Sequence, residues 1–412
     1  MKNTKRIDKW RFWPVFILAF NYIANVSIIG LIVPIYFDRI GVSSILIAVI
    51  SAGTTITYIF SPILLNKLSE RWHRKSSIII AMGGTSIAQL MFFFTLQPIP
   101  FLLARIIEGF FMGFFWTNIQ SSISDNIHHD HKKLTVLYNL SWNTGSLFGF
   151  VFGAIISLNF NDISLLFIIS PIFIFINFFI AIFTFKEPKK INTNSNLKDS
   201  INNEKNRELV QINNKDYNRQ ESKYEFNEIS FPLIYPILLI IIFCFTRGVI
   251  GLVFPLKSEF LNFEVYLIYI ANFFLGLSQS ISMTLASFLS LNNLKKINKF
   301  TIPSLAILFS LMGLNSDYII FIILFVFIGC CIGVMYGLTL KLILSLNMKN
   351  NTSKYSSGFE SFIGLNFLIT AIISGFVIEI SLDLMFYILF ILFLAMAIII
   401  IILVNKKIKF SK

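Results

Sequence analysis

The sequence predicts an all-helical protein that crosses a lipid bilayer twelve times. Three observations lead to this fold class. Apolar residues make up 56% of the 412 residues and charged residues only 13%, a composition too apolar for an ordinary soluble globule. The apolar residues gather in windows of about 20 residues, the length that a helix needs to cross a hydrocarbon core. Several short patterns also recur between the two halves of the chain at nearly constant offsets.

The windows are each bounded by polar clusters. The first is too long for a secretory signal and has no convincing cleavage site, so we expect it to be retained as a span. The ninth is short and has Pro303 near its start, so the alternative is that it forms one element with the tenth. The expected spans are Trp13–Tyr36, Ser44–Leu65, Ser77–Leu96, Phe101–Ser122, Leu134–Leu158, Ser164–Phe185, Phe231–Phe254, Val265–Leu289, Phe300–Leu314, Tyr318–Leu340, Ser356–Ile380 and Leu382–Val404.

The distribution of basic residues predicts the topology. Of the 34 Lys and Arg residues, 30 precede the first span, lie in alternate loops or follow the last span. The opposite loops carry seven acidic residues and only two basic ones, Arg39 and Lys257. Because positively charged loops stay in the cytoplasm, we expect an integral protein of the cell membrane with both termini cytoplasmic. The net charge of +13 therefore reflects topology and does not indicate a nucleic-acid partner.

Two equivalent bundles are expected on either side of a polar linker. Residues 186–230 carry 9 basic and 8 acidic side chains without apolar periodicity, which is typical of a flexible segment. We therefore divide the chain into a six-helix bundle (1–185), a cytoplasmic linker (186–230) and a second six-helix bundle (231–412).

Short matches between the halves predict that the bundles are parallel repeats. The pattern Gly30–Pro34 matches Gly251–Pro255 at an offset of 221, and Gly109 and Gly113 recur as Gly329 and Gly333 at an offset of 220. After the second span of each half, a third pattern recurs at an offset of 226, pairing Ser61, Leu65, Asn66 and Leu68 with Ser287, Leu291, Asn292 and Leu294.

Ionisable residues inside the spans are candidates for ion coupling, because an isolated charge near mid-membrane costs from about 2.5 to over 10 kcal/mol. Arg105 and Glu108 stand three residues apart in one span and share a helix face. Arg247 is expected at a similar depth, which would complete a charge cluster. Glu108 is then either a proton acceptor whose pKa follows its cationic neighbours or a member of a static ion pair. Glu360 is expected near the cytoplasmic boundary, either as a gating charge or extended toward the interface.

Uncharged polar side chains at depth suit hydrogen bonding to a polar organic substrate. Each of them also has a plainer interpretation as an ordinary interhelical hydrogen bond, worth about 1 kcal/mol or less. The candidates for the substrate cavity are Asn21, Asn25, Trp116, Gln120, Asn139, Asn143, Gln279 and Tyr336.

No catalytic centre, metal site or cofactor is predicted. His128, His129 and His131 surround Asp130, but adjacent histidines lack the helical i, i+4 spacing of a preformed metal site. The three cysteines lie in apolar runs, and no phosphate-binding loop of the GxxxxGK[ST] type occurs. The energy for any transport would then come from an ion gradient or from the gradient of the substrate itself.

Two sets of six spans around a central cytoplasmic loop resemble the major facilitator superfamily, and local motifs add to the resemblance. The segment from Asn66 to Lys75 resembles the family signature GxLxDRxGRK, although Glu70 replaces the aspartate and Asn66 and His73 replace the glycines. The resemblance implies a cytoplasmic gate, for which the candidates are Glu70, Arg71, Arg74, Lys75 and Glu360.

Two more patterns resemble family motifs in the spans. Arg105, Glu108 and Gly109 resemble RxxQG, and Gly358, Phe359 and Glu360 resemble a Gly-aromatic-Glu pattern. Both imply proton coupling by analogy. The GPxxGG motif of many drug antiporters is not matched, because Phe150 follows Gly149 where proline would stand.

The sequence therefore predicts a proton-coupled secondary transporter of a small organic solute, working as a monomer by alternating access, and not an enzyme. Export of an amphipathic, drug-like compound is favoured because the expected pathway has few fixed charges and many aromatic residues. Uptake of a sugar or another nutrient is the alternative. A membrane-embedded enzyme or a receptor is a remote alternative, because neither clustered metal ligands nor a large outer domain is found.

Overall fold

The computed structural model describes residues 12–124, 131–160, 162–187, 234–350 and 354–405, and every regular element among them is a helix. The predicted all-helical membrane fold class is confirmed. The helices are α1 (Trp13–Arg39), α2 (Ser44–Ser51), α3 (Gly53–Tyr58), α4 (Ser61–Arg71), α5 (Arg74–Phe94), α6 (Pro98–Ser124), α7 (His131–Asn159), α8 (Leu165–Ile169), α9 (Pro171–Phe183), α12 (Ile234–Phe260), α13 (Val265–Phe288), α14 (Leu291–Leu314), α15 (Tyr318–Asn350), α16 (Lys354–Ile380) and α17 (Leu384–Asn405).

The second expected span is not one continuous helix. In the described residues, 11 helical spans are long and apolar enough to cross a membrane, and the twelfth position is taken by α2, α3 and α4 in succession. Pro62 stands at the start of α4. A proline ring collides with the carbonyl group four residues earlier, here that of Tyr58, so a continuous helix through this point is not favourable.

Proline also separates α8 from α9 within the sixth expected span, because Pro171 opens α9 directly after Ser170. The ninth expected span is complete: α14 is a separate helix of 24 residues with Pro303 inside it. The alternative in which it joins the tenth span is therefore wrong. The weak signal of this window reflects the polar first turns of α14, which extend the helix beyond its apolar part.

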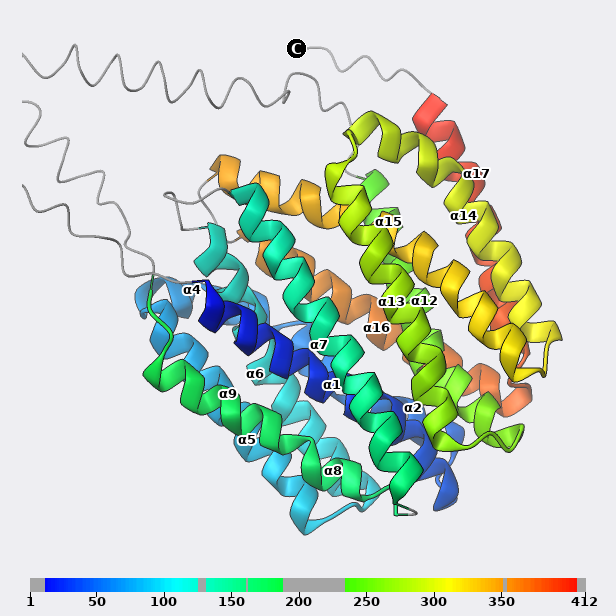
Figure 1. Cartoon of the computed structure of the whole chain (residues 1–412), viewed down its shortest axis with the longest axis horizontal. Coiled ribbons are helices and arrows are strands. Elements are labelled where there is room, and N and C mark those ends of the chain that lie inside the picture. Colours follow the sequence, from blue (N-terminus) through cyan, green and yellow to red (C-terminus); the bar gives the residue numbers. More distant parts are fainter. Residues whose placement is uncertain (1–11, 125–130, 161, 188–233, 351–353, 406–412) are drawn as a thin grey trace, which may run out of the picture.

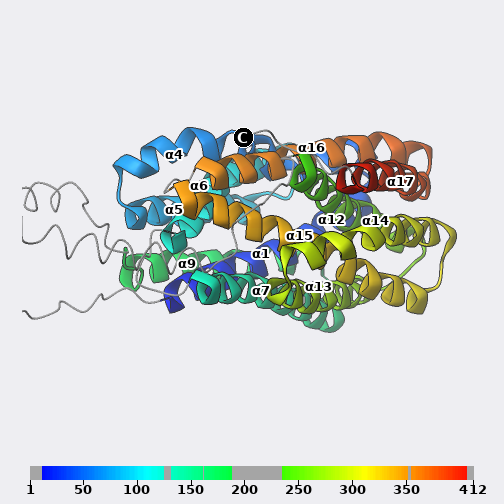
Figure 2. The ribbon, with the colours of Figure 1, turned by 90° about the horizontal axis from the view of Figure 1, so that it is seen from above.

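The helices form two bundles, one from α1 to α9 and one from α12 to α17 (Figure 1). Seen from above, α4, α5 and α9 lie toward one end of the molecule and α14 and α17 toward the other (Figure 2). The bundles meet where α7 packs along α13 and where α16 packs along α2, α3 and α4. We call the end of the bundles where α1 begins and α17 ends the terminal side, and the opposite end the far side.

Both halves use the same close contact between helices. The Ser61 hydroxyl donates to the Gly109 carbonyl oxygen at 3.5 Å in the first half, and the Ser282 hydroxyl donates to the Gly329 carbonyl oxygen at 3.4 Å in the second. The offset between these pairs, 221 and 220 residues, agrees with the glycine pattern in the sequence. The structural partner of Ser61 is thus Ser282, and the match of Ser61 to Ser287 was out of register.

Candidate functional site

A carboxylate on α16 joins the two bundles. The Glu360 side chain is 6% exposed, and it accepts hydrogen bonds from the Tyr58 hydroxyl on α3 and from the Gln120 side-chain amide on α6. Because Glu360 belongs to the second bundle and its two donors to the first, these bonds cross the interface. In this conformation the Glu360 side chain is buried between the helices and does not extend toward the interface, and the gating role stays a prediction.

Aromatic side chains from both bundles surround this carboxylate. The Tyr336 ring stacks on Phe243 with centroids 4.3 Å apart and meets Trp142 edge-on at 5.6 Å and Phe359 at 6.3 Å. The hydroxyl groups of Tyr138 and Tyr336 lie close enough to the Glu360 carboxylate to interact with it electrostatically. We call this group the Glu360 cluster; its members are Tyr58, Gln120, Tyr138, Trp142, Phe243, Tyr336, Phe359 and Glu360.

The expected pair of Arg105 and Glu108 is present, and it belongs to a longer chain of hydrogen bonds. Arg105 Nη1 lies 2.6 Å from Glu108 Oε2, and Gln89 Nε2 donates to Glu108 Oε1 at 2.9 Å. Asn25 and Gln89 exchange hydrogen bonds at 2.9 and 2.8 Å. All four residues belong to the first bundle, so this network holds α1, α5 and α6 together and does not reach the second bundle.

Arg247 does not join the pair, so the expected cluster of three charges is absent. The residue lies thirteen positions from each end of α12. The apolar window ending at Phe254 placed Arg247 about seven residues from the outer end of its span, but α12 continues to Phe260, so Arg247 lies at the middle of the helix. Among the described residues, no ion pair to Arg247 is formed. Whether Glu108 couples protons stays a prediction.

The remaining cavity candidates divide into three groups. Asn21 donates to Asn177 Oδ1 at 3.1 Å, and Asn25 donates to the Ser170 carbonyl oxygen at 2.6 Å. Trp116 packs edge-on against Tyr22 at 5.4 Å. These three contacts hold the first bundle together, as the plainer interpretation expects.

The second group lies between or beside the bundles. Asn143 Nδ2 on α7 approaches Met283 Sδ on α13 at 3.5 Å. The side-chain oxygens of Asn139 and Gln279 are buried without a hydrogen-bond partner in the described chain. The third group, Gln120 and Tyr336, belongs to the Glu360 cluster.

The predicted gate residues lie at the end of α4 and the start of α5, and Glu187, just after α9, contacts this segment. His73 Nδ1 lies 3.1 Å from Glu187 Oε2, and the Arg74 backbone amide donates to Glu187 Oε1 at 2.8 Å. Arg74 is buried, Lys75 is half-buried and Arg71 is exposed. Glu70 lies in the last turn of α4. Of the rejected metal ligands, His128, His129 and Asp130 fall outside the described residues.

Two ion pairs at the far side were not anticipated from the sequence. Arg39, the last residue of α1, forms a bidentate pair with Glu259 near the end of α12, with Nε and Nη2 at 2.6 and 3.1 Å from the two carboxylate oxygens. Lys257 is buried and lies 2.8 Å from Asp383 Oδ1. Arg39 and Glu259 stand 220 residues apart, so they occupy equivalent positions of the two repeats.

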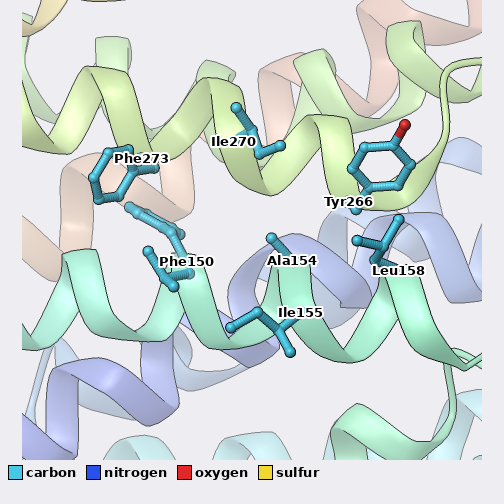
Figure 3. Close-up of a pocket in the computed structure, with 8 residues that line it drawn as sticks. Phe150, Ala154, Ile155, Leu158, Tyr266, Ile270 and Phe273 are labelled. Carbon is cyan, nitrogen blue, oxygen red and sulfur yellow. The ribbon is translucent and has the colours of Figure 1, made fainter.

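An apolar pocket of about 240 Å³ lies elsewhere, on the seam between α7 and α13 (Figure 3). Phe150, Ala154 and Leu158 line it from α7, and Tyr266 and Phe273 line it from α13. None of the polar residues predicted for the substrate cavity lines this pocket.

Comparison with known proteins agrees with this architecture. The sequence matches the model of the Major Facilitator Superfamily over residues 15–314. The crystal structure of the human organic anion transporter MFSD10 (TETRAN) is similar with a TM-score of 0.67, covering 94% of this chain and 98% of that chain at 11% sequence identity. No curated protein matches the sequence. The family match extends over well more than half of a chain with two six-span halves, and the chain therefore belongs to the major facilitator superfamily.

Proposed function

We propose that this protein is a proton-coupled secondary transporter that moves a small amphipathic organic solute across the cell membrane by alternating access. Members of the superfamily are transporters, which supports the general class. We further propose that the protein works as a monomer with both termini in the cytoplasm, so that the terminal side faces the cytoplasm and the far side faces outward.

The observation that carries the proposal is that polar contacts join the two bundles both at the far side and nearer the terminal side, and Tyr269 on α13 also donates to the Ile28 carbonyl oxygen on α1 at 2.7 Å. Arg39 and Glu259 join the bundles at the far side. The bonds from Tyr58 and Gln120 to Glu360 join them nearer the terminal side. If the contacts at one side break while those at the other side stay formed, the bundles can rock relative to each other. Alternating access requires such a movement.

The surroundings of the interface favour an amphipathic solute over a sugar. A sugar site needs many free hydrogen-bonding side chains, and Asn21 and Asn25 are already bonded within the first bundle. The interface instead presents the rings of Trp142, Tyr336 and Phe359. Large aromatic surfaces with a few polar groups bind amphipathic compounds well. Nutrient uptake stays the alternative.

Counterflow in proteoliposomes tests both transport and coupling. Proteoliposomes that contain the purified protein are preloaded with compounds from a library. We expect at least one amphipathic compound to accumulate, and we expect its accumulation to change when a pH gradient is imposed. In Glu108→Gln we expect transport to continue with a weaker response to the pH gradient, because the variant cannot take up a proton at that position. The exposed Glu379→Gln at the end of α16 is the matched control. An unchanged pH response in Glu108→Gln would remove that residue from the coupling mechanism.

Site-directed labelling tests the orientation. Single cysteines introduced within residues 186–230 and after Val404 are exposed to a membrane-impermeant maleimide in intact cells. We expect labelling only after the cells are opened, since both segments are assigned to the cytoplasm by the positive-inside rule. Labelling from outside would reverse the assignment of the terminal side.

A further inference from the structure

We propose that Glu360 is a binding residue for an organic cation, so that the solute carries an amine, quaternary ammonium or comparable positive group. The inference rests on the proposed transport function and narrows its substrate class. It assigns to Glu360 a direct contact with the solute in place of the gating role expected from the sequence.

The first argument is the balance of charge. Glu108 and Glu360 are the buried carboxylates among the described residues. Glu108 has Arg105 at 2.6 Å, whereas no described Lys, Arg or His forms an ion pair with Glu360. Its two partners, Tyr58 and Gln120, are neutral donors. A buried carboxylate without a cation is costly, so the site is completed by a proton or by a positive ligand.

The second argument is the nature of the surrounding side chains. Three tyrosines face the carboxylate, Tyr58, Tyr138 and Tyr336. The Tyr336 ring in turn packs against Phe243, Trp142 and Phe359, so the tyrosines belong to a larger aromatic group. A cation is attracted to the face of an aromatic ring, and cages of such rings recognise quaternary ammonium groups. Gln120 also has a buried side-chain oxygen without a hydrogen-bond partner, which is an acceptor for an ammonium N–H.

The third argument is the position of the donors. Tyr58 and Gln120 belong to the first bundle and Glu360 to the second. When the bundles separate at this depth, Glu360 loses both hydrogen bonds, while Tyr336 stays beside it on the second bundle with Phe243 and Phe359 packed against the Tyr336 ring. The carboxylate is then open to a ligand in a half-cage of aromatic rings. In the present conformation the same residues close the site.

Proton and cation compete for this carboxylate. The titratable groups facing it are Tyr58 on α3, Tyr138 on α7, Cys244 on α12 and Tyr336 on α15, with the neutral Gln120 on α6. None of these groups is a cation, so protonation of Glu360 itself neutralises the site. A positive ligand that binds in place of the proton releases that proton, and the apparent affinity for the cation therefore falls as the pH is lowered.

Two ions of nearly the same shape and opposite charge test the proposal. Saturable binding of radiolabelled tetraphenylphosphonium and tetraphenylborate is measured on the full chain in nanodiscs, with empty nanodiscs subtracted. We expect the wild-type protein to bind the cation, more tightly at higher pH, and to show no saturable binding of the anion. Glu360→Gln should weaken cation binding about tenfold or more, the effect of losing one strong charge interaction, and should remove its pH dependence.

Further variants separate binding from folding. Glu360→Asp keeps the charge and should keep the pH-dependent binding, while Tyr336→Leu removes a ring and should weaken binding severalfold. Glu379→Gln is the control on the same helix, and gel filtration confirms that each variant is folded. Unchanged affinity in a folded Glu360→Gln variant, or equal binding of both ions, would overturn the assignment.

The outcome also separates this inference from the proposed function. A wild-type protein that binds no tetraphenylphosphonium but carries out counterflow of a neutral or anionic compound overturns the cation site and leaves transport standing. A protein that binds the cation through Glu360 but shows no counterflow of any compound supports the site and contradicts the transport function.

Discussion

The two buried carboxylates of the described chain have opposite surroundings. Glu108 lies beside Arg105 and accepts a further bond from Gln89 at 2.9 Å, so its charge is neutralised within its own bundle. Glu360 has two neutral donors, Tyr58 and Gln120, which belong to the other bundle. The chemistry of the two acids is the same, and only the tertiary surroundings make one part of a closed network and the other dependent on the bundle interface.

The Arg105–Glu108 pair should behave as a buried ion pair in stability measurements. Arg105→Met leaves Glu108 without its cation, and breaking a buried pair typically costs about 3–5 kcal/mol. We expect a marked fall in the midpoint of thermal aggregation followed by fluorescence size-exclusion chromatography. The double variant Arg105→Met, Glu108→Gln removes both charges and should recover most of the loss. If the double variant is as unstable as Arg105→Met alone, the charge balance is not what stabilises this region.

At the scale of the elements, glycines determine how closely the helices pack. A Cβ atom at Gly109 on α6 would lie 1.8 Å from the Thr54 carbonyl oxygen on α3, and one at Gly329 on α15 would lie 2.3 Å from the Leu275 carbonyl oxygen on α13. Small residues allow helix backbones to approach closely in membranes. The repeated glycines in the sequence therefore allow α6 to approach α3 closely in the first half, and α15 to approach α13 in the same way in the second half.

Gly109→Ala should therefore separate α6 from α3 and destabilise the protein. The added methyl group meets backbone, which cannot move aside as a flexible side chain would, so we expect loss of folded protein on gel filtration. Gly30→Ala is the matched control, because a Cβ atom at Gly30 on α1 would meet nothing within 4 Å beyond the backbone of its own helix turn, and alanine also favours a helix over glycine by about 1 kcal/mol. Equal yields of the two variants would contradict the packing argument.

At the scale of the whole molecule, a pair of charges joins the two bundles at the far side. Arg39 ends α1 and Glu259 lies one residue before the end of α12, so the first helices of the two halves meet at equivalent positions. The side chains are 41% and 21% exposed, and a partly exposed pair of this kind contributes about 1 kcal/mol or less. Such a contact holds one conformation only weakly, as a transporter needs.

Arg39→Gln should shift the population toward conformations that are open at the far side. Spin labels at Asn159→Cys and Ser316→Cys, in a background without the native cysteines, report the separation of the bundles by pulsed electron resonance. We expect an increase of a few-fold in the share of long distances, since about 1 kcal/mol corresponds to roughly a fivefold change in an equilibrium constant. The charge reversal Arg39→Glu with Glu259→Arg should restore the original distribution. An identical distribution in Arg39→Gln would show that the pair does not hold this end closed.

The sequence by itself determined the fold class, because apolar windows of membrane-spanning length and a repeated pattern of small residues are properties of local composition. It also placed Arg105 beside Glu108, since residues three apart on one helix are neighbours whatever the rest of the chain does. The sequence did not predict the break at Pro62. It also did not predict the full length of α12, which continues past its apolar part through polar residues. For that reason Arg247 lies at the middle of its helix.

Only the tertiary structure decided which distant side chains share a site. Asn21 and Asn25 resemble Gln120 as polar residues at depth, yet the first two bond within their bundle and the third reaches Glu360, 240 residues away along the chain. Contacts across the interface depend on how the two bundles are rotated and how far apart they lie. Few local features of the sequence indicate this relative placement. The hydropathy pattern determines which segments enter the membrane, and the packing of one bundle on the other determines which of their polar groups meet.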